Sequence, residues 1–343
     1  MQKFDLGVVI GRFQLFHNGH ESLIRQALEQ SKRVLVLIGS VNVSRSPKNP
    51  FTFAERNSMI QLCFPGETGS GRIIVRPLRD FPNDAAWVAS VQSEIAAQLE
   101  NGTSGSVAIF GHHKDASSYY LDVFPQYAQV EVQDLSGLSA TPLRENILFS
   151  GQSDLRTLAP YVPEGTLRFL ETFQKLDFYS QLVRETQFLQ NYQKPYQQLP
   201  YPVIFVTTDA VVTCGGHVLV VRRRPEPGRG LLALPGGFLG YNERILDSAI
   251  RELREETRLK VPEPVLHGSL RGQKVFDEPG RSLRGRTITH AFYFELAQTD
   301  LPKVRGGDDA EKAFWLSFSQ FLELDGQMFE DHWSIVSYFL ALD

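Results

Sequence analysis

Short apolar runs alternate with helix-like stretches over the first 150 residues of the chain. The runs that read as strands are residues 7–10, 33–39, 72–76, 106–111 and 130–135. Between them, residues 20–31, 53–64 and 85–99 carry apolar side chains at helical spacing, as in Trp87, Val91, Ile95 and Leu99. Apolar strands that alternate with helices are typical of a parallel sheet covered on both faces. The pattern therefore predicts an α/β, Rossmann-like domain at residues 1–150, which binds ligands at the carboxyl ends of its strands.

The pattern changes after about residue 150. Residues 167–191 predict one long, aromatic-rich helix, and the following segment, 194–201, contains Pro and Gln. We interpret residues 151–195 as a helical connector. Residues 196–343 then show strands at 203–207, 218–222 and 287–296, a strong helix at 243–258 and a closing helix at 334–342. This order predicts a second α/β domain with a mixed sheet.

Length and composition agree with two folded domains. The chain has 343 residues, of which 42% are hydrophobic, enough to fill two cores. The net charge of −4 argues against a nucleic-acid partner, but it allows small phosphate-bearing ligands. The two cysteines, Cys63 and Cys214, are too few for a disulfide framework or a Cys-based zinc site. No signal-like or bilayer-length apolar run is present, so we expect a cytoplasmic protein with no membrane partner, and a homo-oligomer stays open.

Two histidines follow the first predicted strand, in the segment from Gly11 to His20. Gly11 permits a tight backbone approach at the strand end. His17 and His20 are three residues apart at a helix start, so both rings can face one ligand. The backbone N–H groups of a helix start also favour a phosphate. Two ordinary surface histidines are the alternative, and the position directly after a strand argues against it.

A second polar segment, Ser139-Ala140-Thr141-Pro142-Leu143-Arg144, follows the last predicted strand of this domain. Pro142 suits the first position of a helix. Ser139 and Thr141 can donate hydrogen bonds to phosphate oxygens, and Arg144 can clamp a polyphosphate; an ordinary helix cap is the alternative. Together the two segments resemble the HxGH and SxTxxR signatures of the nucleotidyltransferase superfamily.

Over residues 5–150 the chain more closely resembles the archaeal-type nicotinamide mononucleotide (NMN) adenylyltransferases. The supporting residues are Gly11, Arg12, Phe13, Gln14, Asn49 with Pro50, Phe51 and Thr52, Glu55, Arg56, Pro82, Asn83, Asp84, and Gly111 to Asp115 including Lys114. Leu15 departs from the pattern, because proline is frequent there. The resemblance implies the reaction of NMN with ATP to NAD⁺ and pyrophosphate.

The same resemblance implies roles for individual residues. His17 and His20 are expected to donate to the triphosphate of ATP, and Arg144, with Ser139 and Thr141, to hold its phosphates together with Mg²⁺. Gly11, Arg12, Phe13, Asn49, Arg56, Lys114 and Asp115 are expected to line the substrate site. Trp87 is expected either to stack on the nicotinamide ring or to belong to the core. Arg45 and Lys48 lie in a basic loop that is either solvated or able to close over phosphates.

Three glutamates share one face of the predicted helix 243–258. Glu252, Glu255 and Glu256 stand at i, i+3 and i+4, a crowding of negative charge that favours a cation between them. Carboxylate oxygens are hard ligands that suit Mg²⁺, with Mn²⁺ as the second choice. We expect Arg251 to pair with a carboxylate of the preceding loop. The turn that ends at Gly237 is expected to bring backbone near the substrate.

These residues, from Gly237 through Glu243 to Glu256, resemble the Nudix box, with Arg258 in place of its usual glycine. Either Arg258 adopts a left-handed turn or the helix continues, and hydrolysis is expected to survive. The resemblance implies that Glu252, Glu255 and Glu256 bind metal, with catalytic help from Glu255 or Glu256 and an outer role for Glu243. Residues 276–290 resemble ADP-ribose-cleaving Nudix proteins, so Arg281 and Arg284 are expected to hold the diphosphate or ribose; surface arginines are the alternative.

The whole chain resembles bifunctional NMN adenylyltransferase/Nudix hydrolases, which implies the small nucleotides ATP, NMN, NAD and ADP-ribose as partners. Two alternatives stay open. The first domain could use a different phosphate acceptor, and the second could be a non-catalytic sensor of an ADP-ribose-like ligand. The complete glutamate set favours hydrolysis. The choice between NMN and nicotinate mononucleotide stays open as well.

Overall fold

The computed structural model describes residues 3–81, 83–99, 105–111, 123–132, 138–149, 155–298, 300–324 and 326–342. Contacts between Cα atoms divide the chain into two compact units, Met1–Val183 and Arg184–Asp343. Each unit is described by itself below. The predicted divisions at residues 150 and 195 stay predictions.

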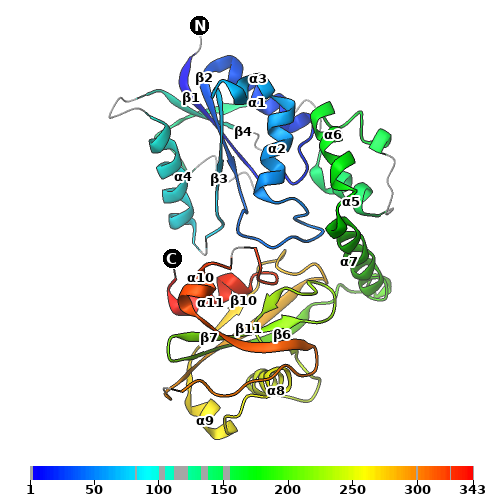
Figure 1. Cartoon of the computed structure of the whole chain (residues 1–343), viewed down its shortest axis with the longest axis vertical. Coiled ribbons are helices and arrows are strands. Elements are labelled where there is room, and N and C mark those ends of the chain that lie inside the picture. Colours follow the sequence, from blue (N-terminus) through cyan, green and yellow to red (C-terminus); the bar gives the residue numbers. More distant parts are fainter. Residues whose placement is uncertain are drawn as a thin grey trace. The chain divides into compact units, whose positions relative to one another are not determined.

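The first unit is built on a sheet of five parallel strands in the order β3-β2-β1-β4-β5. In chain order it contains β1 (Phe4–Gly11), α1 (Asn18–Gln30), β2 (Ser31–Ile38), α2 (Phe53–Cys63), α3 (Pro65–Gly69), β3 (Ile73–Pro77), α4 (Asp84–Gln98), β4 (Val107–Gly111), β5 (Ala128–Glu131), α5 (Ala140–Phe149), η2 (Leu155–Thr157), α6 (Glu164–Phe173) and the start of α7 (Asp177–Gln193) (Figure 1). The predicted α/β class with a parallel sheet is confirmed for this unit.

Helices cover both faces of this sheet. Successive side chains of β2 point to opposite faces, so Val34 and Val36 pack toward α1 and α2, whereas Leu35 and Leu37 pack toward α4. The helical spacing predicted for α4 places Ile95 fully within that second core. Burial of one such aliphatic side chain stabilises the fold by about 1.5–3 kcal/mol. The two cores fix the ends of β1 and β2, which carry the first candidate site.

The aromatic segment after residue 150 forms two helices, α6 and α7, so the prediction of one continuous helix was wrong. α6 packs closely against α2, because a Cβ atom at Gly165 would lie 2.7 Å from the carbonyl carbon of Leu62. Phe173 and Tyr179 are buried in the core of the first unit, and the Tyr179 hydroxyl donates to the Ile147 carbonyl at 2.7 Å. Much of the expected connector thus completes the first unit.

The second unit is built on a mixed sheet in the order β10-β11-β6-β7-β12, with β8 paired to β7 and β9 to β6. Its further elements are η3 (Tyr196–Gln198), β6 (Phe205–Cys214), β7 (His217–Arg223), β8 (Leu232–Ala233), β9 (Gly236–Phe238), α8 (Ile245–Thr257), α9 (Glu263–Gly268), β10 (Leu270–Phe276), β11 (Thr287–Leu296), β12 (Ala310–Ser317), α10 (Phe318–Leu322) and α11 (His332–Leu340). Only the β11–β6 pair within the five-stranded order runs parallel, which confirms the predicted mixed sheet.

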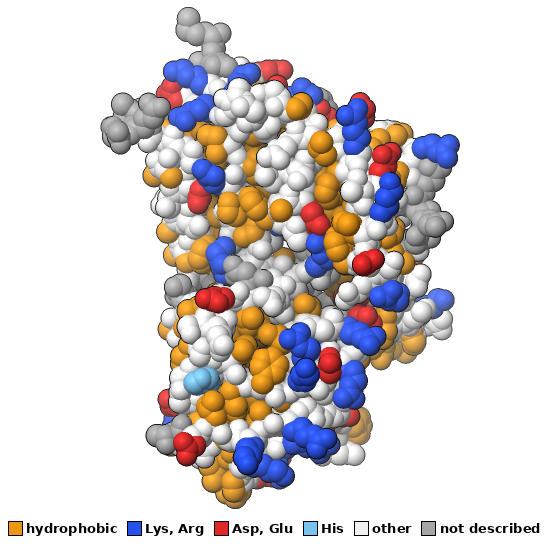
Figure 2. Space-filling model, in the orientation of Figure 1, with side chains coloured by type: hydrophobic (Ala, Val, Ile, Leu, Met, Phe, Trp, Pro, Cys, Tyr) orange, Lys and Arg blue, Asp and Glu red, His pale blue; other side chains and the backbone are white. Residues whose placement is uncertain are grey.

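Helix α8 packs on one face of this sheet through Ala249, Ile250 and Leu253, and α11 packs on the other through Ile335 and Val336. Figure 2 shows acidic and basic side chains together on the visible face of each unit. None of the helices that the structure describes is both long and apolar enough to cross a bilayer.

Candidate active sites

The turn after β1 has an unusual backbone. Phe13 and Leu15 have φ angles of 50° and 93°, both in the left-handed region. Such a conformation costs a non-glycine residue about 1–3 kcal/mol and is concentrated at functional sites. A Cβ atom at Gly11 would lie 3.0 Å from the Phe13 ring, so a larger residue there would have to displace that ring slightly. Proline holds φ near −65°, so a proline could not adopt the positive φ of Leu15.

This turn places His17 and His20 together at the start of α1. Their rings stack with centroids 3.8 Å apart. The backbone N–H of Gly19 donates to Nδ1 of His17 at 3.1 Å, and that of His17 donates to Nδ1 of His20 at 3.4 Å. An Nδ1 atom that accepts a hydrogen bond carries no proton, so the proton of each neutral ring is on Nε2. Both rings therefore present an Nε2–H donor, as the predicted contact with a triphosphate requires.

Arg144, on α5, lies beside the same turn. Its guanidinium donates to the Gln14 carbonyl at 2.9 Å and to the Thr141 hydroxyl at 3.1 Å, and the side chain is buried. Burial, followed by the charge of Arg12, lowers its pKa to about 10. The buried Nε has no hydrogen-bond partner in the described parts of the chain. An anion would satisfy this arrangement, because it would offset the charges of both arginines.

The two hydroxyl-bearing residues of this polar segment lie on the surface, whereas Leu143 is buried in the core. Ser139 and Thr141 are exposed at the start of α5. Pro142 is the third residue of α5, not the first as predicted, and proline is tolerated there because a first-turn N–H has no partner within the helix.

Two residues predicted to bind substrate support the site from within the core. Arg56 is 1% exposed and donates to the carbonyl oxygens of Arg12 and Gly39, both at 2.7 Å, and also to Ser40 and Thr52. It therefore clamps the carboxyl ends of β1 and β2, and burial lowers its pKa to about 10. Phe13 is 2% exposed with its ring 4.9 Å from that of His20. It supports the imidazole from within the core, and the substrate contact expected of Arg56 and Phe13 stays a prediction.

The loop before α2 is held by Gln14, which sequence reasoning had treated only as part of a motif. Its side-chain amide donates to the Phe51 carbonyl and accepts from the Phe51 N–H, both at 3.1 Å. The buried Oδ1 of Asn49 accepts no hydrogen bond from the described residues, so it suits a ligand donor. Arg45 forms a bidentate pair with Glu55 at 2.9 and 3.0 Å, and its guanidinium lies 3.9 Å from the Phe178 ring, so this side chain is not a solvated loop arginine.

The three remaining residues of the predicted substrate site are Trp87, Lys114 and Asp115. The Trp87 ring lies 5.9 Å from that of Phe124 and is packed at the edge of the second core of the first unit. Its stacking on nicotinamide stays a prediction. Lys114 and Asp115 lie outside the described residues.

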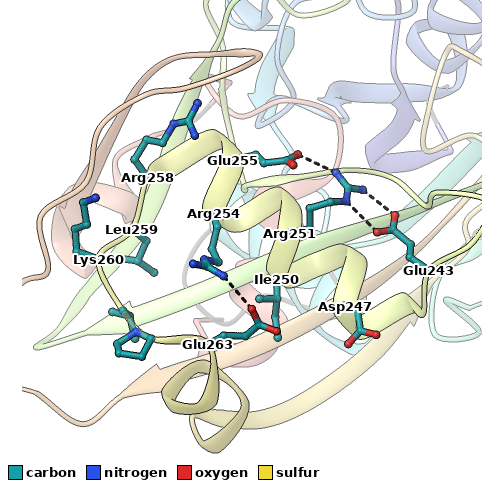
Figure 3. Close-up of a pocket in the computed structure, with 12 residues that line it drawn as sticks. Glu243, Asp247, Ile250, Arg251, Arg254, Glu255, Arg258, Leu259, Lys260 and Glu263 are labelled. Carbon is teal, nitrogen blue, oxygen red and sulfur yellow. Dashed lines mark hydrogen bonds and ion pairs between the residues drawn. The ribbon is translucent and has the colours of Figure 1, made fainter.

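In the second unit, Arg251 holds the carboxylates of α8 and the preceding loop together (Figure 3). It donates twice to Glu243, at 2.9 and 2.8 Å, which confirms the predicted pair with a loop carboxylate. The same guanidinium donates to Glu252 and to Glu255, each at 2.9 Å. The hydrogen bond from Arg251 lowers the pKa of Glu243 to about 2. A cation thus already lies between the acidic groups.

Glu252 and Glu256 face the turn that precedes β9. The Gly236 N–H donates to Glu256 at 3.1 Å, and a Cβ atom at Gly237 would lie 2.5 Å from an oxygen of Glu252. Gly237 is therefore required for the close approach of Glu252. Burial raises the pKa of Glu256 to about 8 and also raises that of Glu252. An opposite charge nearby would favour the ionised form of both groups.

The donor set fits a divalent cation. Glu252, Glu255 and Glu256 supply hard oxygen ligands, and the guanidinium of Arg251 marks the need for positive charge between two of them. The Glu255 side chain is 43% exposed, so it can rotate from Arg251 toward an ion. As the side chains stand, no three His, Cys, Asp or Glu residues among those described converge on one point.

A pocket of about 810 Å³ runs along α8 beside this cluster. It includes Glu243, Arg251 and Glu255, but neither Glu252 nor Glu256, so we place the chemistry at its edge and not in its centre. Arg258 ends α8 in the left-handed conformation, with φ 49° and ψ 30°, which confirms the first of the two expected alternatives. The last carbonyls of the helix accept N–H donors from residues 305 and 307.

The two predicted arginines after β10 differ in their surroundings. The Arg281 side chain is 2% exposed and bound to Asp331 by two hydrogen bonds, at 2.9 and 2.6 Å. This pair gives Arg281 a structural role, and its contact with a ligand stays a prediction. Arg284 lies 3.6 Å from the Glu330 carboxylate and 5.1 Å from the Phe238 ring. Its contact with a diphosphate stays a prediction.

Comparison with known proteins matches the two parts of the chain to two different families. Residues 8–124 match the cytidylyltransferase-like family, and residues 204–339 match the NUDIX domain family. The nicotinamide/nicotinic acid mononucleotide adenylyltransferase of Acinetobacter baylyi is 42% identical over 183 residues, which are 53% of this chain and 93% of that protein. The ADP-ribose pyrophosphatase of Methanocaldococcus jannaschii is 30% identical over 131 residues, 38% of this chain and 71% of that protein.

Two crystal structures of a protein from Francisella tularensis match the whole chain. It is described as a bifunctional NMN adenylyltransferase/ADP-ribose pyrophosphatase. One structure has a TM-score of 0.92 and 35% identity, and the match covers 98% of this chain and 99% of that one. The other, a complex with AMP and Mn ion, has a TM-score of 0.90 and 34% identity and covers 99% of each chain.

Proposed function

Because the chain belongs to the family of bifunctional NMN adenylyltransferase/ADP-ribose pyrophosphatase proteins, we propose that each of its units catalyses one of these two reactions. The first unit transfers the adenylyl group of ATP to NMN, giving NAD⁺ and pyrophosphate. The second unit hydrolyses ADP-ribose to AMP and ribose 5-phosphate. The substrates are small nucleotides, and the cytoplasm remains the predicted compartment.

The stacked imidazoles of the first unit support the transfer reaction most directly. In this reaction an oxygen of the NMN phosphate attacks the α-phosphorus of ATP in line, and the bond from that phosphorus to the bridging oxygen of pyrophosphate breaks. Negative charge moves onto the leaving pyrophosphate. The Nε2–H donors of His17 and His20 and the buried guanidinium of Arg144 suit this charge. Loss of one such donor typically slows catalysis by about 10²–10³-fold.

The carboxylates beside Gly236 and Gly237 support hydrolysis by the second unit. Glu252, Glu255 and Glu256 would hold Mg²⁺ or Mn²⁺, and such a cation supplies Lewis-acid stabilisation of charge on the diphosphate oxygens. Arg251 keeps Glu243 fixed at the start of α8 through its bidentate pair. A carboxylate of Glu255 or Glu256 would take a proton from water as the water oxygen forms a bond to phosphorus and the diphosphate bond breaks.

A panel of acceptors tests the first assignment. Purified protein, ATP and Mg²⁺ would be incubated separately with NMN, nicotinate mononucleotide, phosphopantetheine and glycerol 3-phosphate. We expect NAD⁺ and pyrophosphate in equal amounts from NMN. Turnover of only phosphopantetheine or glycerol 3-phosphate would move this unit to a different acceptor class. Turnover of nicotinate mononucleotide as well would broaden the pyridine specificity.

A separate test distinguishes a hydrolase from a ligand sensor. With ADP-ribose and Mg²⁺ or Mn²⁺, a hydrolase releases AMP and ribose 5-phosphate in equal amounts over many turnovers. A sensor would bind ADP-ribose without releasing either product. Specific, salt-resistant binding to the upstream DNA of its own gene in a gel-shift experiment would support a regulator.

A further inference from the structure

The turn that donates a hydrogen bond to Glu256 is itself fixed by a residue close to the C-terminal end of the second unit. His332, the first residue of α11, accepts a hydrogen bond at Nδ1 from the Leu234 N–H, at 2.8 Å. Two residues later the Gly236 N–H donates to the Glu256 carboxylate at 3.1 Å. The turn between β8 and β9 therefore lies between an imidazole on one side and a catalytic carboxylate on the other.

The imidazole of His332 is fixed in the state that can accept this bond. Its side chain is 7% exposed, and burial lowers its pKa to about 3, so the ring is neutral at physiological pH. Because Nδ1 accepts the Leu234 N–H, the proton is on Nε2. That nitrogen faces Asp209, with Oδ1 3.7 Å away.

Asp209 joins this imidazole to the same turn from β6. Its other carboxylate oxygen accepts from the Thr289 hydroxyl at 2.6 Å, and a Cβ atom at Gly236 would lie 2.6 Å from Oδ1. The turn thus rests directly on the Asp209 carboxylate. The Ala210 N–H also donates to the Pro235 carbonyl at 2.8 Å. The turn has little freedom to move away from α8.

We propose that His332, supported by Asp209, is a positioning residue for Glu256: it fixes the turn whose Gly236 amide orients that carboxylate for metal binding. The proposal rests on the proposed function of the second unit. The buried pair of Arg281 with Asp331 fixes the residue immediately before His332 and so extends the support to the start of α11. His332 itself does not contact the reacting atoms.

Two substitutions separate the hydrogen bond from simple packing. His332→Asn keeps an acceptor oxygen near the position of Nδ1, whereas His332→Leu keeps apolar volume and removes the acceptor. Ser337→Ala is the control, because Ser337 is equally buried on α11 and its hydroxyl has no hydrogen-bond partner within the described residues. Far-ultraviolet circular dichroism and a cooperative urea transition followed by Trp315 and Trp333 would establish that the second unit of each variant is folded.

The first readout is Mn²⁺ binding, measured on the full chain by electron paramagnetic resonance without any substrate. Loss of a residue that supports a metal ligand typically weakens metal affinity by about 10–100-fold. We expect this loss in His332→Leu, near wild-type affinity in His332→Asn, and no change in Ser337→Ala. Unchanged affinity in a folded Leu variant, or equal loss in the Asn and Leu variants, would overturn the proposal.

The second readout needs no metal. Amide hydrogen exchange of a peptide spanning residues 232–238 should be faster in metal-free His332→Leu than in His332→Asn or the wild type. Wild-type protein that binds no Mn²⁺ would contradict the proposed metal site itself. In that event, faster exchange in the Leu variant alone would still support the positioning of the turn, and equal exchange in all variants would refute it.

Discussion

Arg258 occupies a position where its own backbone conformation is costly. Its φ of 49° lies in the left-handed region, which costs a non-glycine residue about 1–2 kcal/mol relative to the right-handed conformation. Replacement with glycine removes that cost but adds about 0.5–1 kcal/mol of unfolded-chain entropy. The side chain is exposed and lies against Gly307, where an added Cβ atom would be 2.7 Å from its Nε. We therefore expect Arg258→Gly to stabilise the second unit by about 0.5–1 kcal/mol.

The three tryptophans make this change measurable in one unit. Trp315 and Trp333 lie in the second unit, and Trp87 lies in the first. In a Trp87→Phe background, fluorescence during urea unfolding therefore reports on the second unit alone. The expected gain corresponds to a rise in melting temperature of roughly 1–4 °C for a unit of this size.

Arg258→Ala is the matched control, because alanine keeps a Cβ atom and with it the left-handed cost. We expect the alanine variant to remain close to the wild type in stability. ADP-ribose hydrolysis should be unchanged in both variants, since the three glutamates are untouched. A glycine variant no more stable than the alanine variant would show that the left-handed backbone at position 258 carries no such cost.

Three further predictions concern single side chains. His20→Ala should lower NAD⁺ formation by about 10²–10³-fold and leave ADP-ribose hydrolysis intact, because the donor belongs to the first unit only; equal loss of both rates would contradict this independence. Glu256→Gln should abolish hydrolysis and weaken Mn²⁺ binding while NAD⁺ synthesis continues, and normal hydrolysis would rule out the assigned cluster. Burial is the larger cause, and the charge of Glu226 the second, that raises the pKa of Glu185 from 4.5 to about 7. Between these two pH values the folded state therefore binds more protons than the unfolded state. The stability of the second unit should therefore fall by about 3 kcal/mol from this group as pH rises through that window. Urea unfolding at pH 5 and pH 8 gives the change in the free energy of unfolding between these two values. In Glu185→Gln this change should be smaller by that amount, and a change equal to that of the wild type would contradict the prediction.

Local patterns predicted most of the fold. Residues 34–38 of β2 are all apolar because helices cover both faces of the sheet, and this apolar run can be read directly from the sequence. The spacing from Arg251 to Glu255 places charged groups on neighbouring turns of one helix, so their pairing could also be predicted. The break between α6 and α7 could not, because neither glycine nor proline interrupts residues 167–191 and the break accompanies packing of α6 on α2.

The roles of individual arginines were the least predictable part of the sites. A motif shows which residue type stands at a position, but it does not show what the guanidinium meets in space. Arg56 meets backbone carbonyls of two strand ends, and Arg281 meets a carboxylate fifty positions along the chain. The support of the Leu234–Gly237 turn by His332 is hidden for the same reason, since 98 positions separate the hydrogen-bonded pair.

Product analysis of the purified wild-type chain, in two parallel reactions with Mg²⁺, tests the activities of both units directly. One contains ATP and NMN, and the other contains ADP-ribose. We predict NAD⁺ with pyrophosphate in the first, and AMP with ribose 5-phosphate in the second. NAD⁺ without cleavage of ADP-ribose would contradict the hydrolase assignment of the second unit. Absence of NAD⁺ would contradict the adenylyltransferase assignment of the first, and with it the link between the two reactions.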